Sequence, residues 1–336
     1  MTDSFDNIPV REDMQTIAFY NCENLFDIYD DSRTNDNDFL PSTVKKWARS
    51  RYLNKLRKLS FAISNIGREE TGKHPALVGL AEVENARVVK DLIEFKHLAD
   101  CNYGYVHYNS LDERGIDVAL IYDKNAFEVL HSETFSVDLT DDDGSLDFTR
   151  DILLVTGLLD GEKIHVLVNH SSSRREGVKE TEHKRMASSN KLSDAIKGLK
   201  EEDADAKIVI IGDFNDEPFN NSVTTLVDNN QLHNPMGTIR SFSRGTVYHD
   251  RKWNLFDQIM ITKPLLDKNY STFQFYKAGI FNKDYLITSK GAYKGSPYRS
   301  WADGGFSGGY SDHFPVYVYI IKEMPHMTNK ASKKWR

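Results

Sequence analysis

Apolar residues recur along the chain in short runs with the length of β-strands. Each run covers five to eight residues and is rich in Val, Ile, Leu, Phe or Tyr, a composition that favours extended strands in a sheet. The predicted strands are residues 16–22, 76–81, 116–122, 152–159, 163–169, 207–211, 256–262 and 316–321. The pattern therefore predicts a core built mainly from sheets.

Longer segments with apolar positions three and four residues apart separate some of these strands and predict helices. The predicted helices are residues 44–66, 86–98, 179–197 and 222–228, with Ser42 or Thr43 as the N-cap of the first. Asp160 and Gly161 lie between two predicted strands, a pair that favours a tight antiparallel hairpin. Since strands and helices alternate but one strand pair is antiparallel, we expect an α/β fold of two mixed β-sheets packed face to face with helices outside.

The 336 residues contain no internal repeat, low-complexity segment or Pro/Gly/Ser-rich linker that would divide the chain. We expect one domain at residues 15–322, with an N-terminal extension at 1–14 and a C-terminal tail at 323–336. Residues 27–42 are rich in Asp and Asn but lack the Gly and the final Glu of an EF-hand calcium loop. We expect this segment to be a solvated surface loop.

The composition, 39% hydrophobic and 28% charged, is typical of a soluble globular protein. No apolar run reaches the 18 or so residues of a membrane span, and the N-terminal sequence has no basic and apolar regions of a secretory signal. The two cysteines suit a reducing compartment, so we expect a cytoplasmic monomer. The formal net charge of -7 argues against a protein that coats nucleic acid, but it does not exclude a nuclease with a local basic groove.

Polar residues lie at one end of five of the apolar runs: they end four of the predicted strands, and Asp312 and His313 come just before the run 316–321. One such residue is ordinary, because Asp and Asn make turns. Five strand ends from distant parts of one chain are harder to explain this way, because a sheet gathers its strand ends at one edge. The residues are Asn21, Glu23, Glu82, Asn169, His170, Asp213, Asn215, Asp312 and His313.

This set of side chains favours metal-assisted phosphate chemistry. The oxygens of Asn21, Glu82, Asp213 and Asp312 suit Mg²⁺ or Mn²⁺ better than zinc. Two histidines add donors for the charge that develops on a phosphate and groups that transfer protons near neutral pH. Because the chain has no Walker-type phosphate loop, we infer hydrolysis of a phosphate ester rather than ATP-driven transfer.

Six segments, in order along the chain, resemble the motif series of the endonuclease/exonuclease/phosphatase superfamily. They read FYNCENLF, LAEVEN, NHSSSR, GDFND, WNLFDQI and GGYSDHFPV, and the resemblance spans residues 17–320. The superfamily includes deoxyribonuclease I, abasic-site endonucleases, sphingomyelinases, inositol polyphosphate 5-phosphatases and deadenylases. The resemblance implies a deoxyribonuclease I-like four-layer sandwich with a divalent metal at one edge of the two sheets.

Carried onto this sequence, the resemblance implies that Glu82 is the principal metal ligand. Asn21 and Asp312 would assist it, with Glu23 nearby. Asp213 is similar to the residue that orients or deprotonates the attacking water. The number of metal ions stays open.

The remaining motif residues resemble those that contact the phosphate. Asn215 is similar to the residue that holds a phosphate oxygen, and alternation along a strand would place it on the same face as Asp213. His313 resembles the histidine against the scissile phosphate, and Asp257 the carboxylate that orients it. His170 matches a phosphate contact or proton donor to the leaving group. Which group is the general base stays open.

The candidates for substrate contact are mostly arginines. They are Arg114, Arg150, Arg174, Arg175 and Arg299, the last of these in the segment 289–301, which mixes basic and aromatic residues. Such a mixture suits phosphate contact and base stacking, although a solvated basic loop over packed aromatics explains it as well.

The leading hypothesis is a phosphodiesterase that cuts DNA or RNA by direct in-line attack of water, in internal or terminal mode. A phosphatase or phosphodiesterase of a small or lipid phosphoester is the alternative, and a non-catalytic binding module is disfavoured because every site position is filled. Two departures from the family pattern are Ala81, where a Gln is common, and Asp216, which with WNLFDQI disfavours the inositol phosphatases.

Overall fold

The computed structural model describes residues 10–140, 144–269, 271–302 and 304–322, which form two large sheets. The six-stranded sheet has the order β14-β17-β1-β2-β4-β3, and the five-stranded sheet has the order β13-β10-β9-β8-β5. Both mix parallel and antiparallel pairs, since β1 is parallel to β2 and β9 is parallel to β10. The expected pair of mixed sheets is confirmed.

The strands of the six-stranded sheet, in chain order, are β1 (Met14–Leu25), β2 (Leu77–Val83), β3 (Tyr103–His107), β4 (Asp117–Asp123), β14 (Gln274–Ile280) and β17 (Val316–Ile321). Those of the five-stranded sheet are β5 (Phe127–Phe135), β8 (Ile152–Leu159), β9 (Glu162–His170), β10 (Ile208–Asp213) and β13 (Asp257–Ile261). Three short hairpins pair β6 (Leu139–Thr140) with β7 (Leu146–Asp147), β11 (Val247–His249) with β12 (Lys252–Asn254), and β15 (Trp301–Ala302) with β16 (Gly305–Phe306).

The α-helices are α1 (Arg49–Asn65), α2 (Arg68–Thr71), α3 (Ala86–Ile93), α4 (Glu182–Glu202), α5 (Asn221–Asn230) and α6 (Met236–Ile239). Short 3₁₀ helices are η1 (Asn37–Phe39), η2 (Lys263–Leu266) and η3 (Asp284–Leu286).

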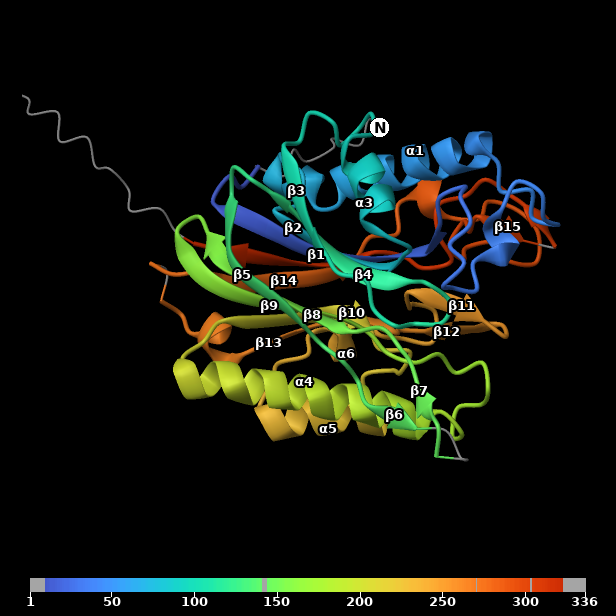
Figure 1. The fold of residues 1–336 in the computed structure, drawn as a ribbon. Helices are drawn as coiled ribbons and strands as arrows, with labels where there is room; N and C mark the ends of the chain where they lie inside the picture. Colours follow the sequence, from blue (N-terminus) through green and yellow to red (C-terminus); the bar gives the residue numbers. More distant parts are fainter. Residues whose placement is uncertain (1–9, 141–143, 270, 303, 323–336) are drawn as a thin grey trace, which may run out of the picture.

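The sheets face each other, and helices cover their outer faces, α1 and α3 on the six-stranded sheet and α4 and α5 on the five-stranded sheet (Figure 1). Three apolar layers hold these four layers together. Phe19, Val166 and Val209 belong to the layer between the sheets, whereas Leu59 of α1 and Leu192 of α4 belong to the two outer layers. The four-layer sandwich is therefore confirmed.

The predicted hairpin between β8 and β9 is also confirmed. Leu159 pairs with Glu162 across the turn, and both turn residues have positive φ, 45° at Asp160 and 80° at Gly161. Asp and Gly tolerate this left-handed conformation better than other residues, which is why the pair marks the turn.

Helix α1 starts later than predicted, and neither Ser42 nor Thr43 caps it. Its N-cap is Ala48. The Thr43 hydroxyl donates instead to the carbonyl of Leu40 at 2.8 Å in a preceding turn, and Trp47 is buried with its Nε1 donating to a backbone carbonyl. Packing of Trp47 therefore fixes the helix start more strongly than the capping preference does.

Of the strands in the two large sheets, three were not predicted, β3, β5 and β14, and all three lie at sheet edges. Their residues are mostly exposed or half-buried, so they lack the continuous apolar run of the central strands. The predicted helix at 86–98 was too long, because α3 ends at Ile93 and turns follow.

The segment 27–42 is largely the exposed surface loop that was expected, but three of its side chains anchor it to the core. Asp27, Asp36 and Phe39 are buried, and Phe39 stacks on Phe26 with ring centroids 4.4 Å apart. The part of residues 1–14 that is described leads into β1 at Met14, whereas residues 1–9 and the predicted tail 323–336 lie outside the described residues.

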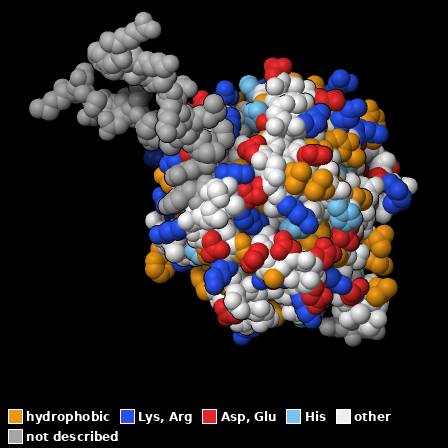
Figure 2. Space-filling model, turned by 90° about the vertical axis from the view of Figure 1, so that its left-hand side faces the viewer, with side chains coloured by type: hydrophobic (Ala, Val, Ile, Leu, Met, Phe, Trp, Pro, Cys, Tyr) orange, Lys and Arg blue, Asp and Glu red, His pale blue; other side chains and the backbone are white. Residues whose placement is uncertain are grey.

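Among the described residues, no helix has the length and apolar character needed to cross a membrane. Figure 2 shows the face that lies to the left in Figure 1, away from β11, β12 and β15. On it Lys, Arg, Asp and Glu side chains are interspersed with scattered hydrophobic ones.

Candidate active site

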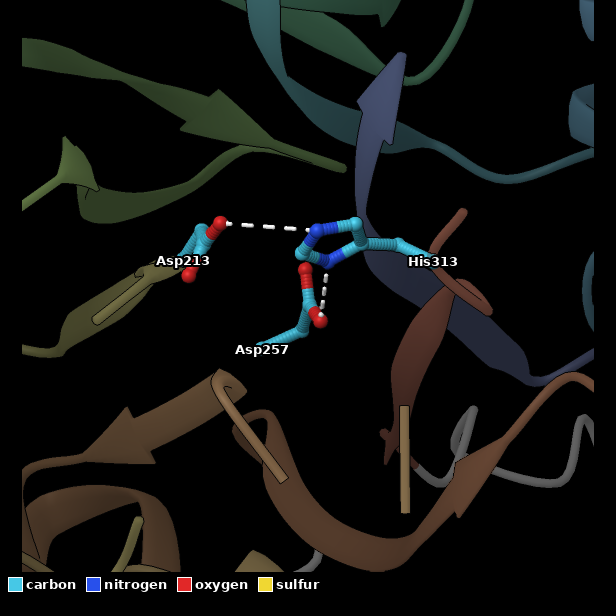
Figure 3. A group of neighbouring side chains, drawn as sticks. All are labelled: Asp213, Asp257 and His313. Carbon is cyan, nitrogen blue, oxygen red and sulfur yellow. Dashed lines mark hydrogen bonds and ion pairs between the residues drawn. The ribbon is translucent and has the colours of Figure 1, made fainter. Parts of the chain in front are cut away.

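Strand ends from both sheets meet where the polar residues were predicted to gather. His170 ends β9 and pairs with Asp213 at the end of β10, and Asp213 also pairs with Asp257 at the start of β13. From the other sheet, Asn21 in β1 donates from Nδ2 to Asp213 Oδ2 at 3.0 Å. His313 lies three residues before β17 starts at Val316, and it completes the group; Figure 3 shows it with Asp213 and Asp257.

Asp213 lies at the centre of this group and is buried. Its Oδ2 is 3.7 Å from His170 Nε2 and 3.8 Å from His313 Nε2, while its Oδ1 accepts from the backbone N–H of Asn215 at 2.9 Å. Burial raises the pKa of Asp213 to about 7, against the opposing effect of the His313 charge. A carboxylate with such a pKa can accept a proton near neutral pH.

His313 lies between two carboxylates (Figure 3). Its Nδ1 is 2.8 Å from Asp257 Oδ2, and Nε2 points toward Asp213. Burial alone would lower the pKa of His313, but the charges of Asp257 and Asp213 raise it well above its usual value. The imidazole is therefore protonated at neutral pH and offers a charged N–H donor.

His170, in contrast, is neutral at neutral pH. Its ring contacts the Arg150 guanidinium, with Arg150 Nη2 3.1 Å from Nε2, and Arg150 in turn donates to Asp112 at 3.0 Å. Burial, reinforced by the Arg150 charge, holds the pKa of His170 well below its usual value. A neutral imidazole contributes hydrogen bonding rather than an acidic proton, so this geometry favours the phosphate-contact role over proton donation.

Asn215 reaches the site by a different route from the one predicted. Strand β10 ends at Asp213, and Asn215 has a φ of 47°, so side-chain alternation along a strand does not place it. Its Nδ2 donates to the Ser171 carbonyl at 3.0 Å. The left-handed turn, stabilised by the hydrogen bond to Asp213 Oδ1, is what positions this amide.

Glu82 also has a positive φ, 58°, at a register shift between β2 and β4. Its Oε2 accepts from the backbone N–H of Asn24 at 2.8 Å, and its Oε1 lies 4.0 Å from the Arg114 guanidinium. Glu23, with a φ of 49°, sits at the facing irregularity in β1. Backbone irregularities in both strands thus bring these two acidic residues to the site edge.

A buried lysine lies beneath this acidic edge. Lys55 of α1 is 1% exposed, and its Nζ donates to Ser300 Oγ at 2.5 Å and to the Tyr310 carbonyl at 2.7 Å. It is 3.7 Å from Glu23 Oε2, which accepts from the Ser300 N–H. Burial raises the pKa of Glu23, as does the nearby Asp312 carboxylate. Lys55 is therefore the counter-charge for a crowded group of carboxylates.

The donor set at this edge fits a hard divalent cation. Glu23 and Asp312 both contact the Arg299 guanidinium, and Glu82 accepts from the N–H of Asn24, the neighbour of Glu23, so three carboxylates gather at this edge. Asn21 contributes an amide oxygen that also accepts from the Glu23 N–H at 2.9 Å. Oxygen donors of this kind suit Mg²⁺ or Mn²⁺.

A second possible location for a metal is the group formed by Asp213, Asp257 and His313. One ligand atom from each lies within 4.8 Å of the others. Because the His313–Asp257 hydrogen bond already uses one ligand atom from each of these residues, we assign the group to proton transfer and phosphate contact.

Arg174 and Arg299, like Arg150, are engaged within the protein. Arg174 donates to the Asn215 carbonyl at 2.5 Å and to Asp216, and its guanidinium covers Phe256 at 4.8 Å. Arg299 bridges Glu23 and Asp312. Arg174 therefore holds the turn at Asn215, and Arg299 lies at the acidic edge.

The aromatic residues of the segment 289–301 do not form a stacking surface. Tyr298 and Trp301 are half-buried and pack near the basic side chains of α1, with Lys58 5.5 Å from the Tyr298 ring and Arg51 5.5 Å from the Trp301 ring. The alternative, a basic loop over packed aromatics, describes this segment better. Of the three aromatic residues in this segment, Tyr293, Tyr298 and Trp301, only Tyr293 is exposed.

Sequence reasoning missed Lys55 and Asp112. Lys55 occupies a helical position between buried Tyr52 and Leu59, so a lysine on the apolar stripe of α1 was an available signal. Asp112 gave no such signal, because its partner Arg150 is distant in the sequence.

Comparison with known proteins places this geometry in context. The sequence model of the Endonuclease/Exonuclease/phosphatase family matches residues 16–322. No curated protein matches the chain.

Solved structures resemble this chain in fold. Their sequence identities are low, so the similarity shows the fold alone. An endonuclease/exonuclease/phosphatase family protein from Bacteroides thetaiotaomicron is 17% identical, with a TM-score of 0.59 over 93% of this chain and 99% of that chain. A mannosyl-6-phosphatase from the same species is 18% identical, with a TM-score of 0.57 over 91% and 99%. D. rerio TDP2 complexed with a single-strand DNA product is 14% identical, with a TM-score of 0.56 over 91% and 98%.

Proposed function

The chain belongs to the endonuclease/exonuclease/phosphatase family, and we propose that it is a divalent-metal-dependent phosphodiesterase that hydrolyses nucleic acid. The observation that carries the proposal is the position of Asp213, a buried carboxylate that contacts Asn21 and lies between a protonated and a neutral histidine. This arrangement supplies a proton acceptor beside two phosphate-binding groups.

In the proposed reaction, Asp213 accepts a proton from the attacking water. The charged N–H of His313, whose orientation Asp257 fixes, donates to an oxygen of the scissile phosphate. Asn215 and His170 bind the other phosphate oxygens. Water attacks in line, the ester bond to the leaving oxygen breaks, that oxygen takes a proton from solvent, and no covalent enzyme intermediate forms.

Asn21, Glu23, Glu82 and Asp312 would hold Mg²⁺ or Mn²⁺. When bound, the ion neutralises charge on the phosphate in the transition state. The protein residues orient the substrate around it, and Lys55 keeps the carboxylates in place.

Nucleic acid is the preferred substrate because a similar structure, D. rerio TDP2, holds a single-strand DNA product. A small phosphoester is the second candidate, because another similar structure is named a mannosyl-6-phosphatase. A cytoplasmic location is part of the proposal, since Cys22 and Cys101 are both free thiols. A monomeric state is part of it too.

The test is to incubate the purified protein with Mg²⁺, or with EDTA, on supercoiled plasmid, an abasic-site duplex, single-stranded RNA, mannose 6-phosphate and bis-p-nitrophenyl phosphate. The variant Asp213→Asn is the blank. Metal-dependent cutting of a polynucleotide that the variant lacks is the expected result. Release of phosphate from the sugar alone would support the second candidate, and no metal-dependent turnover of any substrate would refute both.

A further inference from the structure

Two phenylalanines near the candidate site are far more exposed than apolar side chains usually are. Phe219 is 60% exposed and Phe242 is 96% exposed. The Arg240 guanidinium lies 5.3 Å from the first ring and 5.7 Å from the second. Glu217 holds this guanidinium through Nε–Oε1 and Nη2–Oε2 contacts of 3.0 and 3.4 Å. We call Phe219, Arg240 and Phe242 the aromatic ledge.

One side of the ledge follows a segment that carries a candidate catalytic residue, and the other precedes a segment that is bridged to one. Phe219 follows Asn215 by four residues, so their Cα atoms are at most about 14 Å apart. Phe242 precedes Val247 by five residues, so these two Cα atoms are at most about 18 Å apart, and Val247 forms a β-bridge with His313. A short oligonucleotide held at Asp213 therefore has the ledge within reach.

The segment that carries Arg240 and Phe242 is basic, although the whole chain carries a net charge of -7. Residues 240–254 contain four basic residues and one acidic residue. Arg244, Arg251 and Lys252 are exposed, and no ion pair found among the described residues involves their side chains. The hairpin of β11 and β12 (Figure 1), which is bridged to His313 through Val247, thus carries two exposed cations.

We propose that the aromatic ledge and the β11–β12 hairpin form a binding site for single-stranded nucleic acid, which deepens the proposed function and rests on it. Unpaired bases stack on Phe219 and Phe242, and Arg251 and Lys252 contact the phosphates on either side. A duplex hides the faces of its bases in its own stack, so the site selects single strands. The ledge replaces the segment 289–301 as the stacking surface.

The test measures the binding of a fluorescein-labelled 20-nucleotide single strand by fluorescence anisotropy, in EDTA so that no cutting occurs. Phe219→Ala and Phe242→Ala are each expected to raise Kd about 5- to 150-fold, the usual loss for one stacked base. Both side chains are exposed, so the variants should melt at the wild-type temperature. Tyr276→Ala, at an exposed aromatic on β14, is the matched control and should bind like the wild type.

The charge contribution is measured separately with the double variant Arg251→Gln and Lys252→Gln. Losing two phosphate contacts should lower the slope of log Kd against log salt by about 1.4. DNA and RNA strands of one sequence, and the matching duplex, show which single strand is preferred. Binding of both phenylalanine variants within twofold of the wild type, an unchanged salt slope, or tighter binding of the duplex would overturn the proposal.

Hydrolysis of bis-p-nitrophenyl phosphate by the wild type, with Asp213→Asn as the blank, tests the proposed function by itself, because this small diester does not extend to the ledge. If the diester is cut and the phenylalanine variants bind normally, only the binding site is refuted. If neither the diester nor any polynucleotide is cut, the proposed function fails, whatever the binding results.

Discussion

The two histidines of the candidate site differ in charge because their neighbours differ. His313 faces Asp257 and Asp213, whereas His170 faces Arg150. Two imidazoles on either side of one carboxylate therefore perform different tasks, one as a charged donor and one as a neutral hydrogen-bonding group.

This difference predicts unequal effects of removing the two rings. His313→Ala removes a charged donor to the phosphate and should lower kcat by about 10²- to 10³-fold. His170→Ala removes a neutral contact and should act mainly on KM, with a smaller loss of kcat. Steady-state kinetics on one substrate measure both. Equal losses of kcat would contradict the assigned charge states.

The pH dependence follows from the same residues. Asp213 must be ionised to accept a proton, so kcat/KM should rise with pH through an apparent pKa of about 7. It should fall at alkaline pH, when His313, whose pKa Asp257 and Asp213 raise, loses its proton. Asp257→Asn removes one of these charges, so the alkaline limb should move to lower pH. An alkaline limb that stays in place would show that His313 is not the acidic group.

The motif residues could be identified from the sequence because each motif is a short continuous segment. The residues that contact them in the folded protein could not be identified this way. Asn215 is positioned by a left-handed turn instead of strand alternation, and Arg174 is used to hold that turn. Both facts depend on contacts between segments distant in the sequence, which a local pattern does not encode.

Helix α1 connects the acidic edge of the site to the outer layer of the molecule. Its Lys55 reaches through the layer to Ser300, Tyr310 and Glu23. Removing one partner of a buried ion pair leaves a charge without compensation, which typically costs about 3–5 kcal/mol.

Lys55→Met should therefore lower the melting temperature and also weaken Mn²⁺ binding, measured by titration calorimetry, because Glu23 loses the partner that orients it. Tyr52→Phe, which removes a contact between α1 and Asp91 away from the site, is the matched control. It should affect stability alone. Tighter Mn²⁺ binding by Lys55→Met would mean that the lysine repels the ion rather than positioning its ligands.

At the scale of elements, the buried strands, β13 at one sheet edge among them, were predictable, and the other three edge strands were not. The strands β8 and β17 have the bounds that their apolar runs predict, because both are buried in the middle of the layers. The edge strands β3, β5 and β14 carry polar side chains, and tertiary pairing determines their strand conformation.

Packing of the two sheets brings the ends of β1, β2, β9 and β10 together, and these ends carry residues of the candidate site. Alternation of strands and helices, with one hairpin, was enough to predict this architecture. The distances across the site depend on how the two sheets are placed relative to each other, and no pattern within one strand contains that information.

A site shared by both sheets should stabilise the whole fold when it binds metal. Mg²⁺ that binds only the folded state should raise the melting temperature with increasing concentration. Glu82→Gln removes a charged oxygen ligand, so the rise should be smaller or absent, and differential scanning fluorimetry of the two proteins measures this. An identical rise in both would place the metal elsewhere.

The most direct test of the central claim is the rate at which the wild type and Asp213→Asn hydrolyse bis-p-nitrophenyl phosphate in Mg²⁺. The account predicts turnover by the wild type that EDTA abolishes, and a loss of about 10²- to 10⁴-fold in the variant with an unchanged melting temperature. A variant that turns over at the rate of the wild type would contradict the role of Asp213 as the proton acceptor at this site.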